Sequence, residues 1–116
     1  MKVSELEGAE LDFYVAKAEN ITLEKYDGRL YARNQYCANS WSLSEYYSRA
    51  EQWHPSTDWS QGGPIIERER LQVLGGPDGW CSQSTMPNKL TGWILAETPL
   101  IAAMRAYVAS KFGDEV

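Results

Sequence analysis

The sequence is poor in the residues that build metal centres and disulfide frameworks. It has one histidine, His54, and two cysteines, Cys37 and Cys81, among 116 residues. Four nitrogen or sulfur ligands of the usual kinds are therefore not available for structural zinc, and we predict no metal site. The first residues lead into charged side chains rather than an apolar run, so we expect no secretory signal. A cytoplasmic protein with both thiols reduced is the resulting prediction.

Long apolar runs and an excess of basic residues are also missing. A bilayer is spanned by roughly 20 apolar residues, and without such a run we expect no membrane segment. The net charge of −5 disfavours nucleic-acid binding, because neutralising phosphates requires clustered Lys and Arg. The sequence carries no phosphate-binding loop, HExxH zinc helix or GxSxG elbow. We therefore predict no cofactor and assign no catalytic residue from a motif.

The totals are those of one ordinary globular domain over residues 1–116. Apolar residues make up 43% of the chain and charged residues 23%, and the length suffices for one hydrophobic core. The C-terminal helix is the best specified element, over residues 99–112. Thr98 is suited to cap it, Pro99 to begin it and Gly113 to end it with positive φ. Its apolar stripe predicts a lid on a short sheet, with Arg105 outside.

A second helix is predicted near the N-terminus. Ser4 and Glu7 have the spacing of a capping box, and the regular helix is expected to begin at Ala9 and stop at Asn20. The apolar residues of this helix recur at helical spacing. Its predicted outer face is made of Glu10, Asp12, Lys17 and Glu19.

Strands are predicted between these helices. Residues 21–26 and 29–34 flank Asp27-Gly28, a dipeptide typical of a type I′ hairpin. Residues 71–74 and 80–85 flank a turn at 75–79, and residues 92–96 form a third short strand. The predicted fold is therefore α+β, with a small, mostly antiparallel sheet packed against N-terminal and C-terminal amphipathic helices.

A weaker helical pattern lies in the middle of the chain, after the unpatterned residues 35–42. It would place five apolar residues on one side: Leu43, Tyr46, Tyr47, Ala50 and Trp53. If Tyr46, Tyr47 and Trp53 form a large exposed patch, the protein is a structural or oligomer-forming one.

The following segment reads as an ordered loop over residues 55–64, with Pro64 opening a short helix over 65–70. Gly62 and Gly63 then either present N–H groups to an anion at the start of that helix or form a tight turn. The alternating charges of residues 67–70 predict a solvated face.

The 56–67 segment holds the parts of a polar-ligand pocket with one aromatic wall. The candidate ligand-binding residues are Asp58, Trp59, Gln61, Gly62, Gly63 and Glu67. A self-contained loop would use the same parts differently, with Asp58 as a cap, Trp59 in the core and Glu67 in solvent. His54 either acts with Asp58 and Glu67 in a small hydrolase or transferase, or is a loop imidazole bonded to backbone.

Three segments together resemble the NinX-type family of small bacteriophage and prophage proteins. They are residues 10–19, residues 55–67 (PSTDWSQGGPIIE) and residues 98–113 (TPLIAAMRAYVASKFG). The resemblance implies a cytosolic phage accessory protein and brings no established activity, cofactor or catalytic residue. In the second of these segments, the residues that belong to the signature of the family are Asp58, Trp59, Pro64, Ile66 and Glu67.

These observations favour a non-enzymatic binding protein that works through the 56–67 segment. Its partner would be a host or phage protein, or a small polar metabolite or nucleotide. The alternative is the small hydrolase or transferase built on His54, Asp58 and Glu67.

Overall fold

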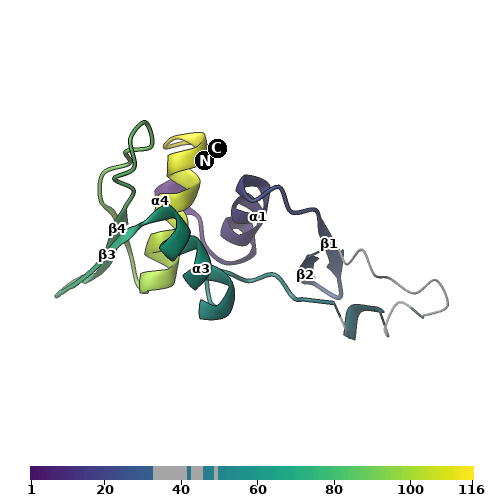
Figure 1. The fold of residues 1–116 in the computed structure, drawn as a ribbon. Coiled ribbons are helices and arrows are strands. Elements are labelled where there is room, and N and C mark those ends of the chain that lie inside the picture. The colour runs from purple at the N-terminus through teal and green to yellow at the C-terminus, as the bar shows by residue number, and fades with distance from the viewer. Residues whose placement is uncertain (33–41, 43–45, 49) are drawn as a thin grey trace.

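The computed structural model describes residues 1–32, 42, 46–48 and 50–116, and it has the predicted α+β class. Its helical elements are η1 (Val3–Glu5), α1 (Gly8–Ala18), α3 (Trp59–Glu69) and α4 (Pro99–Phe112). One antiparallel sheet pairs β1 (Leu23–Tyr26) with β2 (Arg29–Ala32). The other has the order β3 (Gln72–Gly76), β4 (Gly79–Gln83), β5 (Ile94–Ala96). The strands thus divide between two sheets rather than forming the single sheet that was predicted (Figure 1).

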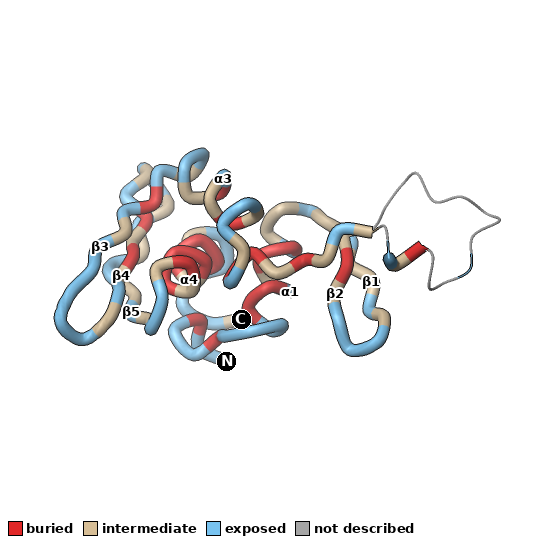
Figure 2. The backbone as a smooth tube through the Cα atoms, turned by 90° about the horizontal axis from the view of Figure 1, so that it is seen from below, coloured by how far each residue is buried: buried red, intermediate tan, exposed pale blue. Residues whose placement is uncertain are grey.

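Helix α4 lies at the centre of the molecule. Its predicted bounds are confirmed, and the Thr98 hydroxyl accepts the Ile101 N–H at 3.1 Å. The helix covers the β3–β5 sheet as predicted, and it is also enclosed, because α1 and α3 contact it as well. Its buried residues are Leu100, Ala102, Ala103, Met104, Ala106, Tyr107, Val108 and Ala109, and they fall on most sides of the helix (Figure 2). None of the described helices has the length and apolar content needed to cross a membrane.

The N-terminal helix differs from its prediction at its start and on its outer face. Ser4 lies in η1, and Glu7 precedes α1 without a side-chain capping bond, so the predicted capping box is wrong. Asn20 follows the helix with a φ of 58°, consistent with the predicted stop. Asp12, predicted to face solvent, is only 5% exposed.

The hairpin predictions are confirmed. Asp27 and Gly28 have φ of 52° and 75°, the positive values that a type I′ turn requires, and Tyr26 pairs with Arg29. In the second sheet Gly76 pairs with Gly79 across Pro77-Asp78. The β3–β5 sheet turns Val73, Ser82 and Ile94 toward the core, while Leu95 on the opposite face is 70% exposed.

The chain returns to the first hairpin before α3. The Trp53 N–H donates to the Leu30 carbonyl at 2.8 Å, and Tyr47 stacks on Tyr26 with ring centroids 4.3 Å apart. Tyr46 and Trp53 are 7% and 8% exposed, so these two residues do not form the exposed apolar patch that would mark a structural or oligomer-forming protein. Cys81 is a free thiol. The predictions for residues 33–41 and 43, Cys37 among them, lie outside the described residues.

A charged network joins α1, α3 and α4. Arg68 donates two hydrogen bonds to the Glu19 carboxylate, at 3.0 and 2.6 Å, and the Tyr107 hydroxyl donates to the same group. Burial alone would raise the pKa of Glu19, but these hydrogen bonds outweigh it and the pKa lies below its ordinary value. Arg68 also bonds Glu69, a carboxylate that Lys89 and Lys111 both approach to 3.8 Å. In the run of residues 67–70, predicted as a solvated face, Arg68 is 51% exposed while it pairs with Glu19, and the prediction is wrong for Glu69, whose side chain is 14% exposed.

Replacing Tyr107 with Phe tests this network. We expect the free energy of unfolding at pH 7 to fall by about 1–2 kcal/mol, because the hydroxyl loses its bond to the Glu19 carboxylate and the bond it accepts from Arg68 at 3.3 Å, while the Arg68–Glu19 pair remains. The stability that charged Glu19 contributes is complete above its unfolded pKa of 4.5 and is lost as pH falls through the lower folded value. The difference between variant and wild type should therefore shrink below about pH 4. Denaturant unfolding from pH 3 to 8 measures it.

Tyr14→Phe is the matched control, since the Tyr14 hydroxyl makes no hydrogen bond to a described residue. Equal losses in the two variants at pH 7 would contradict the role assigned to the Tyr107 hydroxyl.

Candidate functional site

Helix α3 begins at Trp59, five residues before the start predicted at Pro64. Asp58 is its N-cap: one carboxylate oxygen accepts the Ser60 N–H at 2.9 Å and the Ser60 hydroxyl at 2.6 Å. The hydrogen bonds from Ser60 hold the pKa of Asp58 below its ordinary value. The spacing Asp58-x-x-Gln61 is the sequence signal that marks this start, because it matches the pattern of a capping box.

The two glycines lie inside α3 and are not a free anion-binding loop. The Gly62 N–H donates to the Asp58 carbonyl at 2.9 Å, so the predicted presentation of this group to an anion is wrong. A Cβ on Gly62 would stand 2.5 Å from the Pro55 carbonyl oxygen and 2.7 Å from Leu100 Cδ2. Gly62 therefore allows the close approach of α3 to the preceding loop and to α4.

Gln61 fastens the loop that precedes α3. Its side-chain oxygen accepts the His54 N–H at 2.8 Å. Its amide nitrogen donates to the Gln52 carbonyl at 2.6 Å and to the Glu51 carboxylate at 3.0 Å. Both ends of the Gln61 side chain are thus used within the protein, so this residue positions α3 and the loop relative to each other.

A buried polar contact joins the same loop to α1. Asp12 accepts the Ser56 N–H at 2.9 Å through its side chain, and its backbone carbonyl accepts the Trp53 indole N–H at 2.9 Å. Burial raises the pKa of Asp12, and the hydrogen bond from the Ser56 N–H offsets only part of this effect. Asp12 and Ser56, at 5% and 2% exposure, were not among the predicted site residues because their partners lie 44 residues apart in sequence.

The three residues of the alternative enzyme hypothesis are not brought together. His54 Nδ1 lies 3.6 Å from the Asp58 carboxylate, and this buried nitrogen has no hydrogen bond to a described residue. Glu67 stands nine residues beyond Asp58 along α3, which corresponds to about 13 Å of helical rise. A general base, its orienting acid and a second carboxylate at that separation do not meet around one substrate atom.

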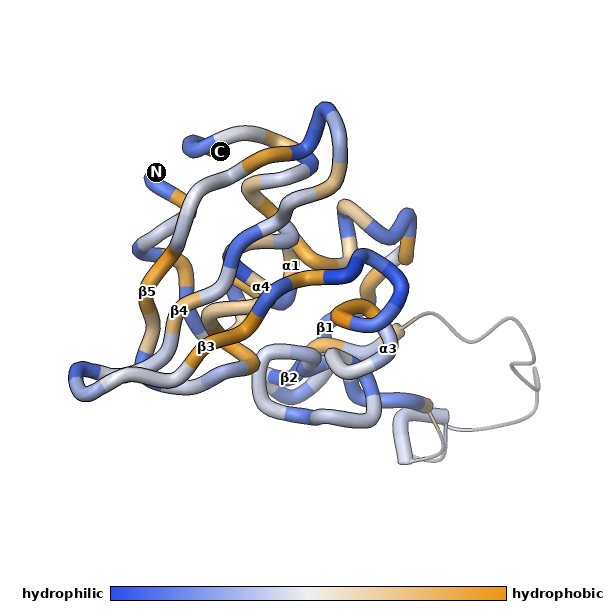
Figure 3. The backbone as a smooth tube through the Cα atoms, turned by 60° about the vertical axis from the view of Figure 1, so that its left-hand side comes forward, coloured by the Kyte–Doolittle hydropathy of each residue, from blue (hydrophilic) through white to orange (hydrophobic). Residues whose placement is uncertain are grey.

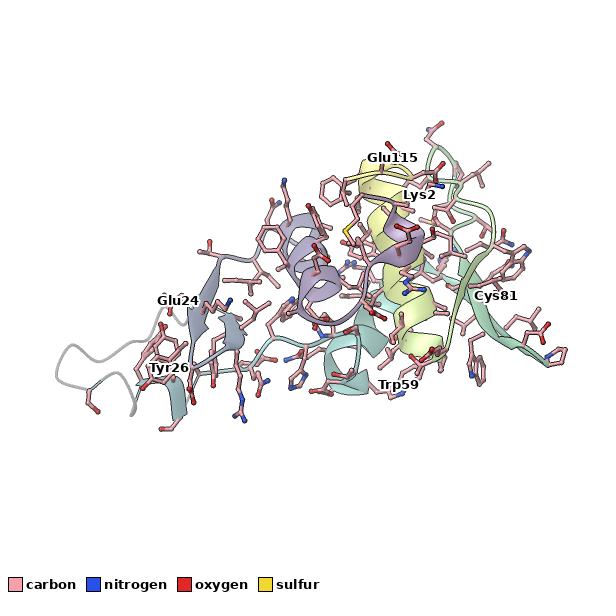
Figure 4. The ribbon with its side chains drawn as sticks, turned by 180° about the vertical axis from the view of Figure 1, so that it is seen from behind. Lys2, Glu24, Tyr26, Trp59, Cys81 and Glu115 are labelled. Carbon is pink, nitrogen blue, oxygen red and sulfur yellow. The ribbon has the colours of Figure 1, made fainter. Side chains whose placement is uncertain are left out.

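Within α3, the exposed residues of the 56–67 segment are Trp59, Ser60, Pro64 and Glu67. Trp59 is 56% exposed and does not enter the core, in contrast to one of the two alternatives for this side chain. Trp59, Gly63 and Glu67 recur every four residues and share one face of the helix, with Pro64 exposed beside them. Figure 4 shows Trp59 at the end of the molecule where α4 begins. Of the six candidate ligand-binding residues, Gln61 and Gly62 are engaged internally and Asp58 caps the helix, while Trp59 and Glu67 are exposed and Gly63 is half-buried between them.

Alanine substitutions at the two glycines separate packing from helix propensity. Gly62→Ala should lower the free energy of unfolding by about 1–3 kcal/mol, because its Cβ would meet a backbone carbonyl. Gly63→Ala should raise it by about 0.5–1 kcal/mol, since its Cβ would stand 3.9 Å from the Trp59 ring and alanine favours helix. Thermal or urea unfolding measures both. A stabilised Gly62→Ala variant would show that α3 does not pack at this distance.

The buried carboxylate predicts a pH dependence of the opposite sign to that of Glu19. Because the folded pKa of Asp12 is raised above 3.8, lowering pH toward 3.8 protonates the folded state first and stabilises it. Asp12→Asn keeps the acceptor for Ser56 but has no proton to gain. As pH falls from 7 to about 4, wild type should gain stability and the variant should not, so the free energy of unfolding of the variant minus that of wild type should decrease. A difference that stays constant across this range would contradict the raised pKa.

The comparison with known families agrees with the resemblance noted in the sequence. The model of the family described as bacteriophage P22 NinX matches residues 2–111, a range that includes α1, both sheets, the whole 56–67 segment and all but the last residue of α4. No curated protein matches the sequence. A family match over nearly the whole chain shows the family and, with it, an association with phage. The chain belongs to the bacteriophage P22 NinX family.

Proposed function

We propose that this phage protein is a non-enzymatic binding protein that acts in the host cytoplasm by docking a host or phage protein on the solvent face of α3. The observation that carries the proposal is the exposure of Trp59, at 56%, within a segment whose other large apolar side chains face the core. Tryptophan is enriched among the residues that dominate binding energy at protein interfaces.

The shape and chemistry of the segment favour a protein over a small polar ligand. The amide of Gln61, one carboxylate oxygen of Asp58 and the N–H of Gly62 all have partners within the protein. What remains for a ligand is the outward face of a helix, with an aromatic ring, a proline and the carboxylate of Glu67. Small-molecule sites are usually concave, whereas an exposed helix face suits a complementary protein surface.

The internal contacts also prepare this surface for binding. Asp58 caps the helix, Gln61 ties it to the preceding loop, and Gly62 packs it against α4. Trp59 is therefore held on an ordered helix before a partner arrives. A preformed surface avoids part of the ordering entropy that association otherwise requires. In this proposal Trp59 and Glu67 contact the partner, while Asp58, Gln61 and Gly62 hold them in place.

Trp59→Ala tests the proposal, with Trp93→Ala as the matched control. Trp93 is 49% exposed and lies beside β5 rather than on α3. A partner captured from infected cells by wild type should be purified and titrated against both variants. We expect Trp59→Ala to weaken binding about 30-fold or more, the loss typical of a dominant interface residue, and Trp93→Ala to leave it unchanged.

The unfolding midpoint of each variant checks that the fold is intact, since truncating an exposed side chain changes stability by about 0.5 kcal/mol or less. Equal binding by wild type and Trp59→Ala, or equal losses in both variants, would refute the assignment of the α3 face.

A further inference from the structure

Among the residues that the structure describes, strand β3 pairs on one side only, and its outer edge lacks the usual protection against pairing. It is the first strand in the order β3-β4-β5, and Gln72–Gly76 contains no charged residue and no proline. Most of the strand is exposed, as its colour in Figure 2 shows. The opposite edge is better protected: β5 has three residues, and its Leu95 carbonyl accepts a hydrogen bond from Arg105 at 2.9 Å. Natural sheets usually shield open edges with charge, proline or short strands, so β3 stands out as a pairing site.

The backbone groups that face this open edge follow from the pairing pattern. The Leu95 carbonyl accepts a hydrogen bond from Arg105, so the backbone groups of Leu95 point away from β4, and Leu95 and Cys81 are a non-hydrogen-bonded pair. The backbone groups of Cys81 therefore point toward β3, where Cys81 exchanges hydrogen bonds with Leu74. The two-residue turn at Pro77-Asp78 leads to the same assignment, because the pair that closes it, Gly76 and Gly79, is hydrogen-bonded, and the next hydrogen-bonded pair is then Leu74 and Cys81. Alternation along β3 then turns the N–H and C=O groups of Val73 and Gly75 outward.

We propose that β3 pairs antiparallel with β3 of a second copy of this chain, about a two-fold axis at Leu74. Each Val73 then faces Gly75 of the second copy, and the two pairs exchange four backbone hydrogen bonds. Moving the register toward the turn would place Val73 opposite Pro77, which has no N–H. Moving it the other way would place Gly75 opposite Leu71, whose N–H already donates to the Ile66 carbonyl at 3.1 Å. The strand therefore has one fully bonded register with itself.

Charge complementarity selects a second copy as the occupant. Arg70 precedes Leu74 by four residues and Asp78 follows it by four, so the same register brings Arg70 of one copy toward Asp78 of the other. Both residues are exposed. Two chains of net charge −5 repel each other over most of their surfaces. An uncharged strand flanked at both ends by opposite charges is a contact at which that repulsion is relieved.

The outward face of the sheet supports the same contact. Leu74, Cys81 and Leu95 form a row across the three strands on the side away from α4, and Leu74 and Leu95 are 56% and 70% exposed. Figure 3 shows hydrophobic residues in both β3 and β5. Figure 4 marks Cys81 on the middle strand. In the proposed dimer the two Leu74 residues are directly opposite, about 4.5 Å apart at Cα, and the row continues through both copies.

Sedimentation of the purified full chain between about 10 µM and about 1 mM tests the proposal, since small interfaces associate in this range. Wild type should show a concentration-dependent dimer, and Leu74→Lys should weaken dimerisation at least about tenfold by placing two ammonium groups on the axis. Leu95→Lys is the matched control on the same face, two strands away from the axis, and should dimerise like wild type. Circular dichroism melting confirms that both variants fold.

A second set of variants tests the register. Arg70→Asp and Asp78→Lys should each weaken the dimer, and the double variant should restore it, because the opposite charges again face each other. A monomeric wild type at the highest concentration overturns the proposal. A dimer that Leu74→Lys leaves unchanged also overturns it. A dimer that Leu74→Lys and Leu95→Lys both abolish overturns it too, because that result would indicate that the sheets stack face to face. Trp59→Ala lies outside this contact and should leave it unchanged, so the outcome is independent of the function proposed for α3.

Discussion

The close contact at Gly62 is the constraint on which the arrangement of the candidate site depends. At this point the Pro55 carbonyl, α3 and Leu100 of α4 meet with no room for a side-chain carbon. Helix α4 is itself enclosed by α1, α3 and the β3–β5 sheet, so the contact ties α3 to the most buried element of the protein. The orientation of α3 determines in turn which of its residues face solvent, and Trp59 is among them.

Polar contacts complete this attachment and engage several polar groups of the segment within the protein. Gln61 bonds three residues of the preceding loop, and Asp12 bonds the loop from the side of α1. This polar segment therefore connects α1, the preceding loop and α3, and the surface proposed for docking is the outward face of α3. The proposed dimer contact at β3 lies on another element, so the two surfaces can be used at the same time.

The parts of the fold that sequence alone predicted are those set by local chemistry. Asp27-Gly28 requires positive φ at both positions, and Thr98, Pro99 and Gly113 mark the ends of α4 within the sequence itself. The start of α3 was missed because Gly62-Gly63-Pro64 has a poor intrinsic preference for helix. The Asp58 cap and packing against α4 overcome that preference.

The burial of Asp12 could not be inferred from α1 alone. Its position follows the polar side of the helical pattern, and the groups that satisfy it, the Ser56 N–H and the Trp53 indole, come from a segment more than 40 residues away. The same holds for Arg68, whose partner Glu19 lies 49 residues earlier. For the candidate site, sequence predicted the segment, and two of the six candidate residues, Trp59 and Glu67, are exposed on α3. It could not separate these from the residues that hold the segment in place.

Amide hydrogen exchange at Gly62 tests the central claim most directly, because this N–H is buried and donates to the Asp58 carbonyl only if α3 starts at Trp59. The structure predicts slow exchange at Gly62, comparable to that of amides in the middle of α4. Exchange at the rate of an unstructured glycine would contradict it. That result would return residues 58–63 to a loop and remove the helix face on which Trp59 is presented.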